Sequence, residues 1–432
     1  MPRSTITPVD RAAPFDVGEL FFSTTDVHGR ITSCNDVFLR IAAYTPEEML
    51  GAAHSIVRHP DMPRCVFQLL WDRLLAGRPI GAYVKNLTSA GEYYWVFALA
   101  MPIHAGFLSL RLKPTSERLA VVQRLYTHLL DVERSAGHDK AEAIAKGTAT
   151  LEAALGELGC RDYDEFMGAA LRGEVEARER ALLLRGSLTA ARRSPFQDLP
   201  LLDALAQEAA EQAEALESVS IATHRIALNS AIAAARLAES GAALGVLSEQ
   251  VAELASSIQA QAYELEAARR ELGPVFESIT FQVSFATLVA ETSASFGAQA
   301  RASRASAAEQ RATFGDTLPA LGAMLDGVLR DSLARTQEAV LVLGSALRRF
   351  DRIGESFRRV LLTSEFSHVT GRTLAATILG GGDYAALLAD LSGVTGSARK
   401  RLDTLLRATH ELRSAVQGWR LAETRRPAAR CG

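Results

Sequence analysis

Cysteine is scarce in this sequence, and its four copies are spread over 432 residues without a CxxC pair. This spacing argues against a disulfide framework and against a zinc site, so we predict no metal centre. It fits reduced thiols in a cytosolic protein. The four positions are Cys34, Cys65, Cys160 and Cys431.

Long apolar runs are also missing, because no uninterrupted run approaches the roughly 18 to 20 residues that a helix needs to span a bilayer. The first 20 residues contain early Pro and Asp where a secretory signal would have an apolar core. We therefore predict a cytoplasmic protein without a membrane span.

An excess of one charge is absent as well. The chain has 47 basic and 50 acidic residues, a net charge of -3, so no overall field attracts it to nucleic acid. The sequence has no P-loop, no GxSxG and no evident Ser-His-Asp or Cys-His arrangement, and the "GGGD" at 380–383 lacks the lysine of a phosphate loop. We predict that the protein is not an enzyme and does not bind nucleic acid.

The chain does contain enough apolar residues, 48%, to build cores, and its length suggests two or three domains. Up to about residue 114 it alternates short β-prone runs with short helical ones, and five of these runs read as strands. After that point only helical periodicity is found. We predict an α+β domain with a five-stranded antiparallel sheet and short helices, followed by an all-α bundle.

Two stretches of the helical half have apolar residues at alternating steps of three and four, which is the pattern of a coiled-coil seam. They read as a helical hairpin over 201–272, with its tip near Ser240. Breakers at 194–200, 273–274, 319 and 380–383 predict helix boundaries and hence helices of moderate length. The seam positions are Leu202, Leu205, Ala209, Gln212, Leu216, Val219, Thr223 and Ile226, then Leu247, Val251, Leu254, Ile258, Gln261, Leu265, Ala268 and Leu272.

A dense polar motif, "VRHPDMP" at 57–63, lies in the α+β part. Together with "FFSTTDVHGRITSCNDVF", "YVKN" and "GEYYWVFALAMPI", in this order and spacing, it resembles the PAS domain of bacterial aerotaxis receptors over residues 19–114. In that family the domain holds non-covalent FAD, whose redox state reports on electron transport. The resemblance implies the same cofactor here.

Five residues match motif positions that the family associates with flavin binding: Asn35, Arg58, His59, Asp61 and Asn86. Their chemistry suits that role. An arginine offers a bidentate fork to a pyrophosphate, and an asparagine on a strand offers an amide donor and acceptor to the edge of the flavin ring.

Other interpretations stay open at this point. Asp61 can cap the following helix and His59 can be structural, which would leave a ligand-free PAS domain. Haem is a minor alternative, because His54 and His59 precede the helix as candidate axial ligands. Flavin photochemistry is disfavoured, because Cys65 lies beyond the segment where the reactive cysteine of such domains occurs.

The stretch 221–255 resembles the signalling tip of methyl-accepting chemotaxis receptors. In that family the tip docks a histidine kinase and its coupling protein and contacts other receptors, which implies the same partners here. Ala233, 241–244 and 249–252 depart from the family pattern and remove charges and an aromatic residue. We predict partner contacts at Asn229, Ile232, Arg236, Val246 and Val251, and a homodimer.

Together these features predict a cytoplasmic redox sensor in which a PAS domain signals through a divergent chemoreceptor-like module. The alternative is a ligand-free PAS adaptor that acts by protein–protein interaction. The predicted segments are an N-terminal extension (1–18), a PAS domain (19–114), a helical connector (115–200), the hairpin (201–272), a further bundle (273–424) and a tail (425–432).

Overall fold

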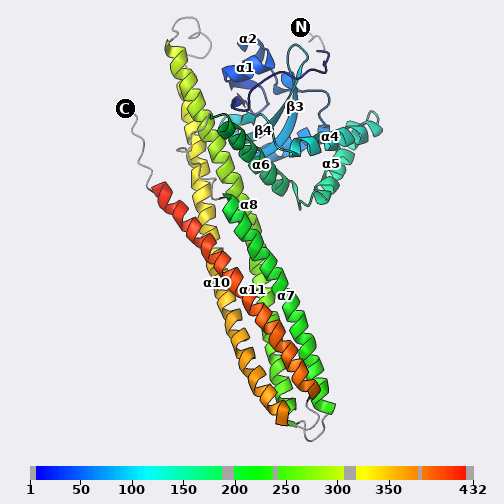
Figure 1. Ribbon diagram of the computed structural model, residues 1–432. Helices are drawn as coiled ribbons and strands as arrows, with labels where there is room; N and C mark the ends of the chain where they lie inside the picture. Colours follow the sequence, from blue (N-terminus) through cyan, green and yellow to red (C-terminus); the bar gives the residue numbers. More distant parts are fainter. Residues whose placement is uncertain (1–5, 187–198, 237–241, 306–317, 378–381, 425–432) are drawn as a thin grey trace. The chain divides into compact units, whose positions relative to one another are not determined.

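The chain divides into two units, which we describe separately from a computed structural model (Figure 1). The sheet unit comprises residues 1–194 and 280–336, and the bundle unit comprises 195–279 and 337–432. The structure describes residues 6–186, 199–236, 242–305, 318–377 and 382–424.

The first part of the sheet unit is a five-stranded antiparallel sheet, which confirms the predicted α+β fold. The strand order is β2-β1-β5-β4-β3, so β3 and β2 form the two edges. The strands are β1 (Phe21–Thr25), β2 (Ile31–Cys34), β3 (Ile80–Leu87), β4 (Tyr93–Ile103) and β5 (Gly106–Leu112).

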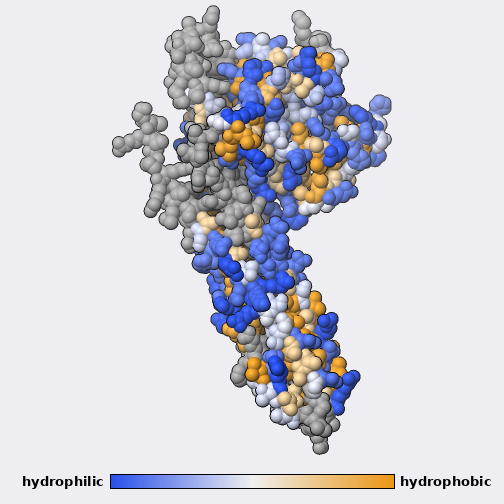
Figure 2. All heavy atoms as spheres, viewed as in Figure 1, coloured by the Kyte–Doolittle hydropathy of each residue, from blue (hydrophilic) through white to orange (hydrophobic). Residues whose placement is uncertain are grey.

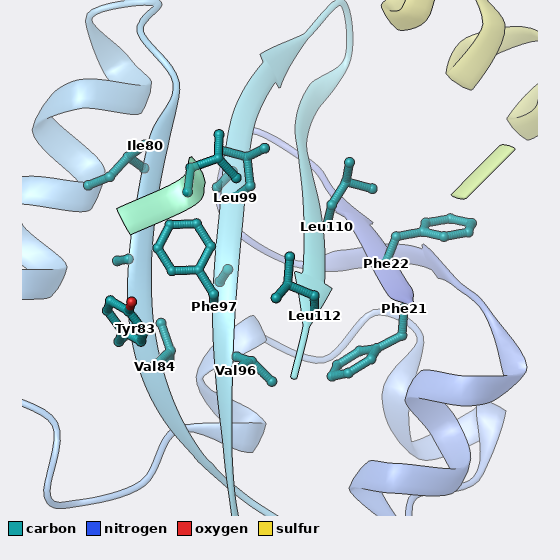
Figure 3. Close-up of a cluster of buried hydrophobic side chains, with 14 of the residues drawn as sticks. Phe21, Phe22, Ile80, Tyr83, Val84, Val96, Phe97, Leu99, Leu110 and Leu112 are labelled. Atoms are coloured by element: carbon teal, nitrogen blue, oxygen red, sulfur yellow. The ribbon is translucent and has the colours of Figure 1, made fainter. Parts of the chain in front are cut away.

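Successive side chains alternate between the two faces of the sheet. Phe21 and Phe22 therefore leave β1 in opposite directions (Figure 3). We call inner the face that carries the paired residues Ala82, Ala98, Arg111 and Phe21, and outer the face that carries Tyr83, Phe97 and Leu112.

Four short helices between β2 and β3 cover the inner face. Phe38 stacks on Phe21 with ring centroids 5.5 Å apart, and Trp71 meets Phe107 edge to face at 5.6 Å. Local signals set the helix ends: Thr45 forms a capping box with Glu48. The helices are α1 (Asp36–Ala42), α2 (Pro46–Met49), the 3-10 helix η1 (His54–Val57) and α3 (Arg64–Leu75).

Three further helices of the sheet unit are α4 (Arg118–Ser135), α5 (Lys140–Glu157) and α6 (Tyr163–Leu184). Helix α6 lies close against β3, because a Cβ on Gly81 would come within 3.1 Å of Met167. The hydroxyl group of Tyr163 donates to the carbonyl of Gly81 at 2.9 Å, and that of Tyr126 donates to the carbonyl of Tyr83 at 3.0 Å. Helices α4 and α6 are thus bonded to the edge strand β3.

The bundle unit is helical, and its core combines residues from four helices, such as Ile226, Leu247, Ala375 and Leu388. Wherever the side chains are described, the predicted seam positions are buried or half-buried, so they face the interior of the bundle. The predicted tip near Ser240 lies outside the described residues. The helices are α7 (Leu199–Arg236), α8 (Ala242–Ala305), α10 (Leu318–Thr377) and α11 (Gly382–Thr424). Residues 280–305 of α8 and 318–336 of α10 belong to the sheet unit.

The predicted helix boundary at 273–274 is wrong, and with it the expectation of moderate helix lengths. Helix α8 has 64 residues and passes through Pro274, and α10 has 60 residues. Leu272 and Ile279 are buried on either side of the proline. Tertiary packing of the apolar side chains therefore outweighs the local cost of a proline inside the helix.

Replacing Pro274 with alanine is expected to stabilise the bundle unit, because the alanine N–H can restore the bond to the carbonyl of Arg270 that proline cannot make. We expect the free energy of unfolding to rise by about 1–2 kcal/mol. The rise is smaller than the full cost of a proline in a helix, because alanine also makes the unfolded chain more flexible and so stabilises the unfolded state. Thermal unfolding followed by circular dichroism at 222 nm measures the change. A lower midpoint than that of the wild type would show that proline at position 274 stabilises the bundle unit.

One described helical stretch, Leu244–Ser295, is long and apolar enough to cross a bilayer on length and composition. Within its most apolar window, 56% of the residues are buried inside the protein. Core helices of non-membrane proteins meet the same two criteria, so this stretch is weak evidence for a membrane span.

Candidate functional site

The motif at 57–63 lies along the free edge of β3. Arg58 forms an antiparallel bridge with Asn86, and the N–H of His59 donates to the carbonyl of Lys85 at 3.4 Å. At the other end of the motif, Met62 Sδ lies 3.2 Å from the backbone nitrogen of Lys85 and accepts its N–H. The structure thus brings the motif and "YVKN" together, as adjacent backbone segments.

The charged residues of the motif form a small network at this edge. Lys85 Nζ donates to Asp61 Oδ2 at 2.8 Å, and this bond lowers the pKa of the Asp61 carboxyl. His59 is 3% exposed, and its Nδ1 accepts a bond from the Asp61 N–H at 3.0 Å. Burial and the charge of Lys85 lower the pKa of His59, so the ring is neutral at neutral pH.

Arg58 is half-buried, and its guanidinium lies over the Phe67 ring, 3.9 Å from the centroid. One Nη donates to the carbonyl of Met62 at 3.3 Å. Stacking and this single bond fix the plane of the guanidinium. Of its five N–H groups, one is engaged in that bond.

Asn86 is 3% exposed, and its Nδ2 has no hydrogen-bond partner. The residue paired with it on β4, Tyr94, is 1% exposed, and its hydroxyl group is likewise buried without a partner. A buried polar group without a partner costs about 1–3 kcal/mol. Two such donors on paired residues of one sheet face fit a ligand that supplies acceptor atoms, as the edge of a flavin ring does.

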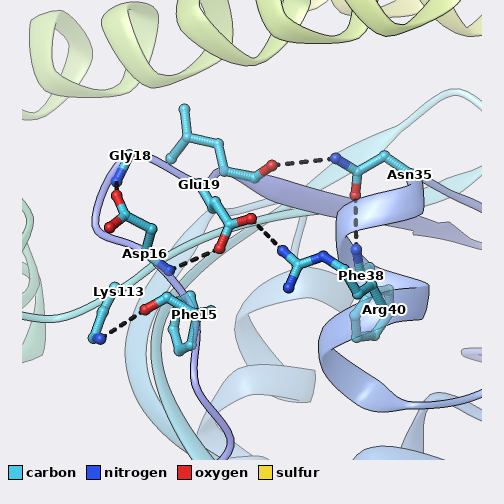
Figure 4. Close-up of polar contacts among 9 residues, drawn as sticks. Phe15, Asp16, Gly18, Glu19, Asn35, Phe38, Arg40 and Lys113 are labelled. Atoms are coloured by element: carbon cyan, nitrogen blue, oxygen red, sulfur yellow. Dashed lines mark hydrogen bonds and ion pairs between the residues drawn. The ribbon is translucent and has the colours of Figure 1, made fainter. Parts of the chain in front are cut away.

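Asn35 lies elsewhere, at the junction of β2 and α1. Its Oδ1 accepts from the N–H group of Phe22 at 3.2 Å. Figure 4 shows its two other bonds: Oδ1 accepts from the N–H group of Phe38 at 3.4 Å, and Nδ2 donates to the carbonyl of Leu20 at 3.1 Å. Asn35 is the N-cap of α1. The structure therefore gives it a structural task and does not pair it with the other four predicted residues.

The interpretation of Asp61 as a helix cap is wrong. Helix α3 begins after Pro63, which makes no side-chain cap bond, and Asp61 is paired with Lys85. Glu133 of α4 caps α3 instead, because its carboxylate accepts from the N–H groups of Arg64 at 2.9 Å and Cys65 at 2.8 Å. Sequence reasoning missed Glu133, which is 69 residues away from the helix that it caps.

A second buried carboxylate holds the end of the sheet. Glu174 of α6 is 0% exposed and accepts from Tyr83 Oη at 2.8 Å and from the N–H groups of Thr115 at 2.6 Å and Ser116 at 3.1 Å. The hydroxyl group of Ser116 donates to it as well. Glu174 thus ties the segment between β5 and α4 to β3.

Cys65 and His54, the residues considered for flavin photochemistry and for haem binding, are not available for these roles. Burial raises the pKa of the Cys65 thiol to about 12, so it is not a thiolate. His54 Nε2 is bonded to a guanidinium nitrogen of Arg111, and a guanidinium can only donate. Across the described ranges, no group of three or more His, Cys, Asp or Glu residues is placed to hold a metal ion.

His54 makes the sheet unit sensitive to acid. Burial and the neighbouring Arg111 charge lower the pKa of His54 from 6.5 to about 3. Above pH 6.5 the His54 ring is neutral in both the folded and the unfolded state, so the folded state keeps its full stability. Between pH 6.5 and pH 3 the ring takes up a proton only in the unfolded state, so stability falls with the pH. We expect the free energy of unfolding to fall by on the order of 1–2 kcal/mol between pH 7 and pH 5.

Urea unfolding at several pH values tests this expectation. In His54→Gln, which keeps an amide acceptor for Arg111, the change between pH 7 and pH 5 should be clearly smaller. An identical pH dependence in both proteins would rule out His54 as its source.

The predicted partner residues of the bundle unit differ in exposure. On α7, Asn229, Ile232 and Arg236 are exposed, and on α8 Val246 is 59% exposed. Figure 2 shows apolar surface near the lower end of this unit. Val251 is 0% exposed and packs in the core, so its prediction as a surface contact is wrong; as a seam residue it faces the other helices.

Comparison with known proteins agrees with this geometry. Residues 31–106 match the family described as PAS fold, so the sheet with its four short helices is a PAS domain. The chain is 38% identical over 141 residues to the aerotaxis receptor of Escherichia coli (strain K12). That match covers 32% of this chain and 27% of the receptor, so the chain spans about a quarter of its relative.

Solved structures with similarity to the chain include a PAS domain from Colwellia psychrerythraea, at 17% identity and a TM-score of 0.20, covering 22% of this chain and 86% of that one. Another is the blue-light activated histidine kinase of Erythrobacter litoralis, at 16% identity and a TM-score of 0.21, covering 26% and 41%. The LOV domain of Aureochrome1 has 14% identity and a TM-score of 0.22, covering 24% and 85%.

Proposed function

We propose that this protein is a cytoplasmic, non-enzymatic redox sensor whose PAS domain binds FAD and signals through its helices. The observation that carries the proposal is the buried amide nitrogen of Asn86, which has no hydrogen-bond partner, on a residue whose backbone is bridged to Arg58 of the motif at 57–63. Similarity to an aerotaxis receptor over this region supports it.

In this proposal FAD supplies the ability to accept and release electrons, and the residues of the chain bind and orient it. Asn86 and Tyr94 donate hydrogen bonds to its ring from the inner face. Arg58, whose plane is fixed by Phe67, offers its remaining N–H groups to the phosphates. His59, Asp61 and Lys85 keep the motif on the edge of β3, and Asn35 keeps the first turn of α1 in place.

The carboxylates of Glu133 and Glu174 suggest how a change at the ligand reaches the helices. Glu133 joins the first turn of α3, directly after the motif, to α4. Glu174 joins α6 to the start of α4 and to β3. A ligand that favours one position of the motif therefore also favours one position of α4. It shifts the equilibrium between the two positions only by the difference in its affinity for them.

Purification of the full chain and its visible spectrum test the cofactor. Absorbance of a bound flavin, retained through gel filtration, is the expected result. A colourless protein that takes up no FAD on incubation would contradict the proposal and favour the ligand-free PAS adaptor. A Soret band would favour haem.

Exposed apolar side chains favour a docking function for the bundle unit. Ile232 is 47% and Val246 59% exposed on the two helices that flank the predicted tip. We propose a homodimer whose bundle contacts a chemotaxis histidine kinase, its coupling protein or other chemoreceptors through Asn229, Ile232, Arg236 and Val246. In pull-downs with these purified proteins, Ile232→Glu should weaken capture while Tyr263→Glu, exposed further along α8, should not; capture of none of them by the wild type would contradict the assignment.

A further inference from the structure

A cation lies in the interior of the sheet unit. Arg111, on the inner face of β5, is 2% exposed and forms no ion pair with an acid among the described residues. Its guanidinium donates to Ser23 Oγ at 3.0 Å, to the Ser109 carbonyl at 3.5 Å and to His54 Nε2, and it lies 4.7 Å from the centre of the Phe38 ring.

The groups around Arg111 do not neutralise it. His54 is neutral, because its Nε2 accepts from a guanidinium that can only donate. Burial raises the pKa of the Cys34 thiol to about 12 and that of the Tyr94 hydroxyl well above its usual value, so both remain protonated. Burial lowers the pKa of Arg111 to about 10, which leaves it charged at neutral pH.

Small side chains lie on the β4 and β3 side of this charge on the inner face. Ala98 is paired with Arg111, Ala82 is paired with Ala98, and Ala100 is paired with Ser109. The unpartnered donors of Tyr94 and Asn86 belong to the same face. The inner face therefore presents a guanidinium, a hydroxyl group and an amide, all able to donate, together with three buried alanines whose side chains are small.

We propose that Arg111 is a ligand-binding residue that pairs with the negatively charged edge of a planar heterocycle lying on these alanines. The inference rests on the proposed function where the heterocycle is the ring of FAD. Two-electron reduction of that ring by dithionite, with one proton taken from water, would leave one negative charge on it, and Arg111 would compensate this charge. His54 holds the guanidinium in position and is a positioning residue.

The full chain and its Arg111→Met and Arg111→Lys variants test the pairing with flavin. The midpoint potential of bound FAD is measured by stepwise reduction with dithionite, and the affinity for oxidised FAD by fluorescence quenching. We expect Arg111→Met to weaken binding of reduced relative to oxidised FAD about tenfold, a fall of about 30 mV for two electrons. Arg111→Lys should keep most of the wild-type potential, and equal potentials in all three proteins would overturn the inference.

A second measurement does not depend on flavin. If Arg111 serves to bind a ligand, its charge is buried without an opposite charge in the ligand-free protein, which costs stability. Arg111→Met removes this charge, so the variant should melt at the same or a higher temperature than the wild type. Benzoate, a planar carboxylate, should raise the melting temperature of the wild type and not that of the variant. A variant that melts clearly below the wild type, with no benzoate effect in either, would show that Arg111 is structural. If the wild type takes up no FAD, the proposed function fails while this measurement still decides the role of Arg111.

Discussion

Replacing Glu174 with alanine is expected to lower the free energy of unfolding of the sheet unit by about 3–5 kcal/mol, the largest effect of any single substitution considered. The change leaves Tyr83 Oη and the N–H groups of Thr115 and Ser116 without their acceptor. Each buried donor that loses its partner costs about 1–3 kcal/mol. The substitution of Glu174 also removes the hydrogen bonds that join α6 to the segment before α4.

Urea unfolding followed by tryptophan fluorescence measures this effect. Trp71 and Trp95 report on the sheet unit, and a Trp419→Phe background removes the third tryptophan. Glu152→Ala, an exposed glutamate on α5, is the matched control and should change stability by less than about 0.5 kcal/mol. Equal effects of the two substitutions would mean that Glu174 does not hold the sheet and helices together.

Replacing Asn86 with aspartate is expected to reduce bound FAD at least tenfold and to lower the stability of the ligand-free protein, because a buried carboxylate costs more than a buried amide. Asn86 Nδ2 has no partner within the chain, so the substitution breaks no bond made by that nitrogen. An ionised aspartate cannot donate as the amide does, and a missing donor to a bound ligand costs about 1–3 kcal/mol.

The FAD content of purified protein, released by heat and measured by fluorescence, gives the first readout, and the melting temperature without ligand gives the second. Asn229→Asp, the same change on the exposed surface of α7, should leave both readouts unchanged. Unaltered FAD content in Asn86→Asp would remove Asn86 from the binding site.

The sheet could be predicted from the sequence because its signals are local. Strand-forming runs, glycine-containing turns and the helix-spaced residues 37–42 each appear within about ten residues. The seam of the bundle was visible for the same reason. Pro274 shows the limit of such reasoning: a local rule predicted a break, and apolar packing along α8 prevails over it.

The parts of the site that join distant segments could not be predicted. Glu133 and Glu174 accept bonds from residues more than 50 positions away, and nothing in their own sequence neighbourhood distinguishes them from solvated glutamates. Arg111 occurs in "FLSLRLK", where alternating apolar and polar residues indicate a strand with one solvated face. Only the helices packed on the inner face show that this face is buried.

The amount of FAD released from the purified full chain decides whether this protein is a flavin-binding sensor. We predict about one FAD per chain after incubation with the cofactor and gel filtration, with a visible flavin spectrum that bleaches on reduction by dithionite. A folded wild-type protein that holds no flavin under these conditions would contradict it.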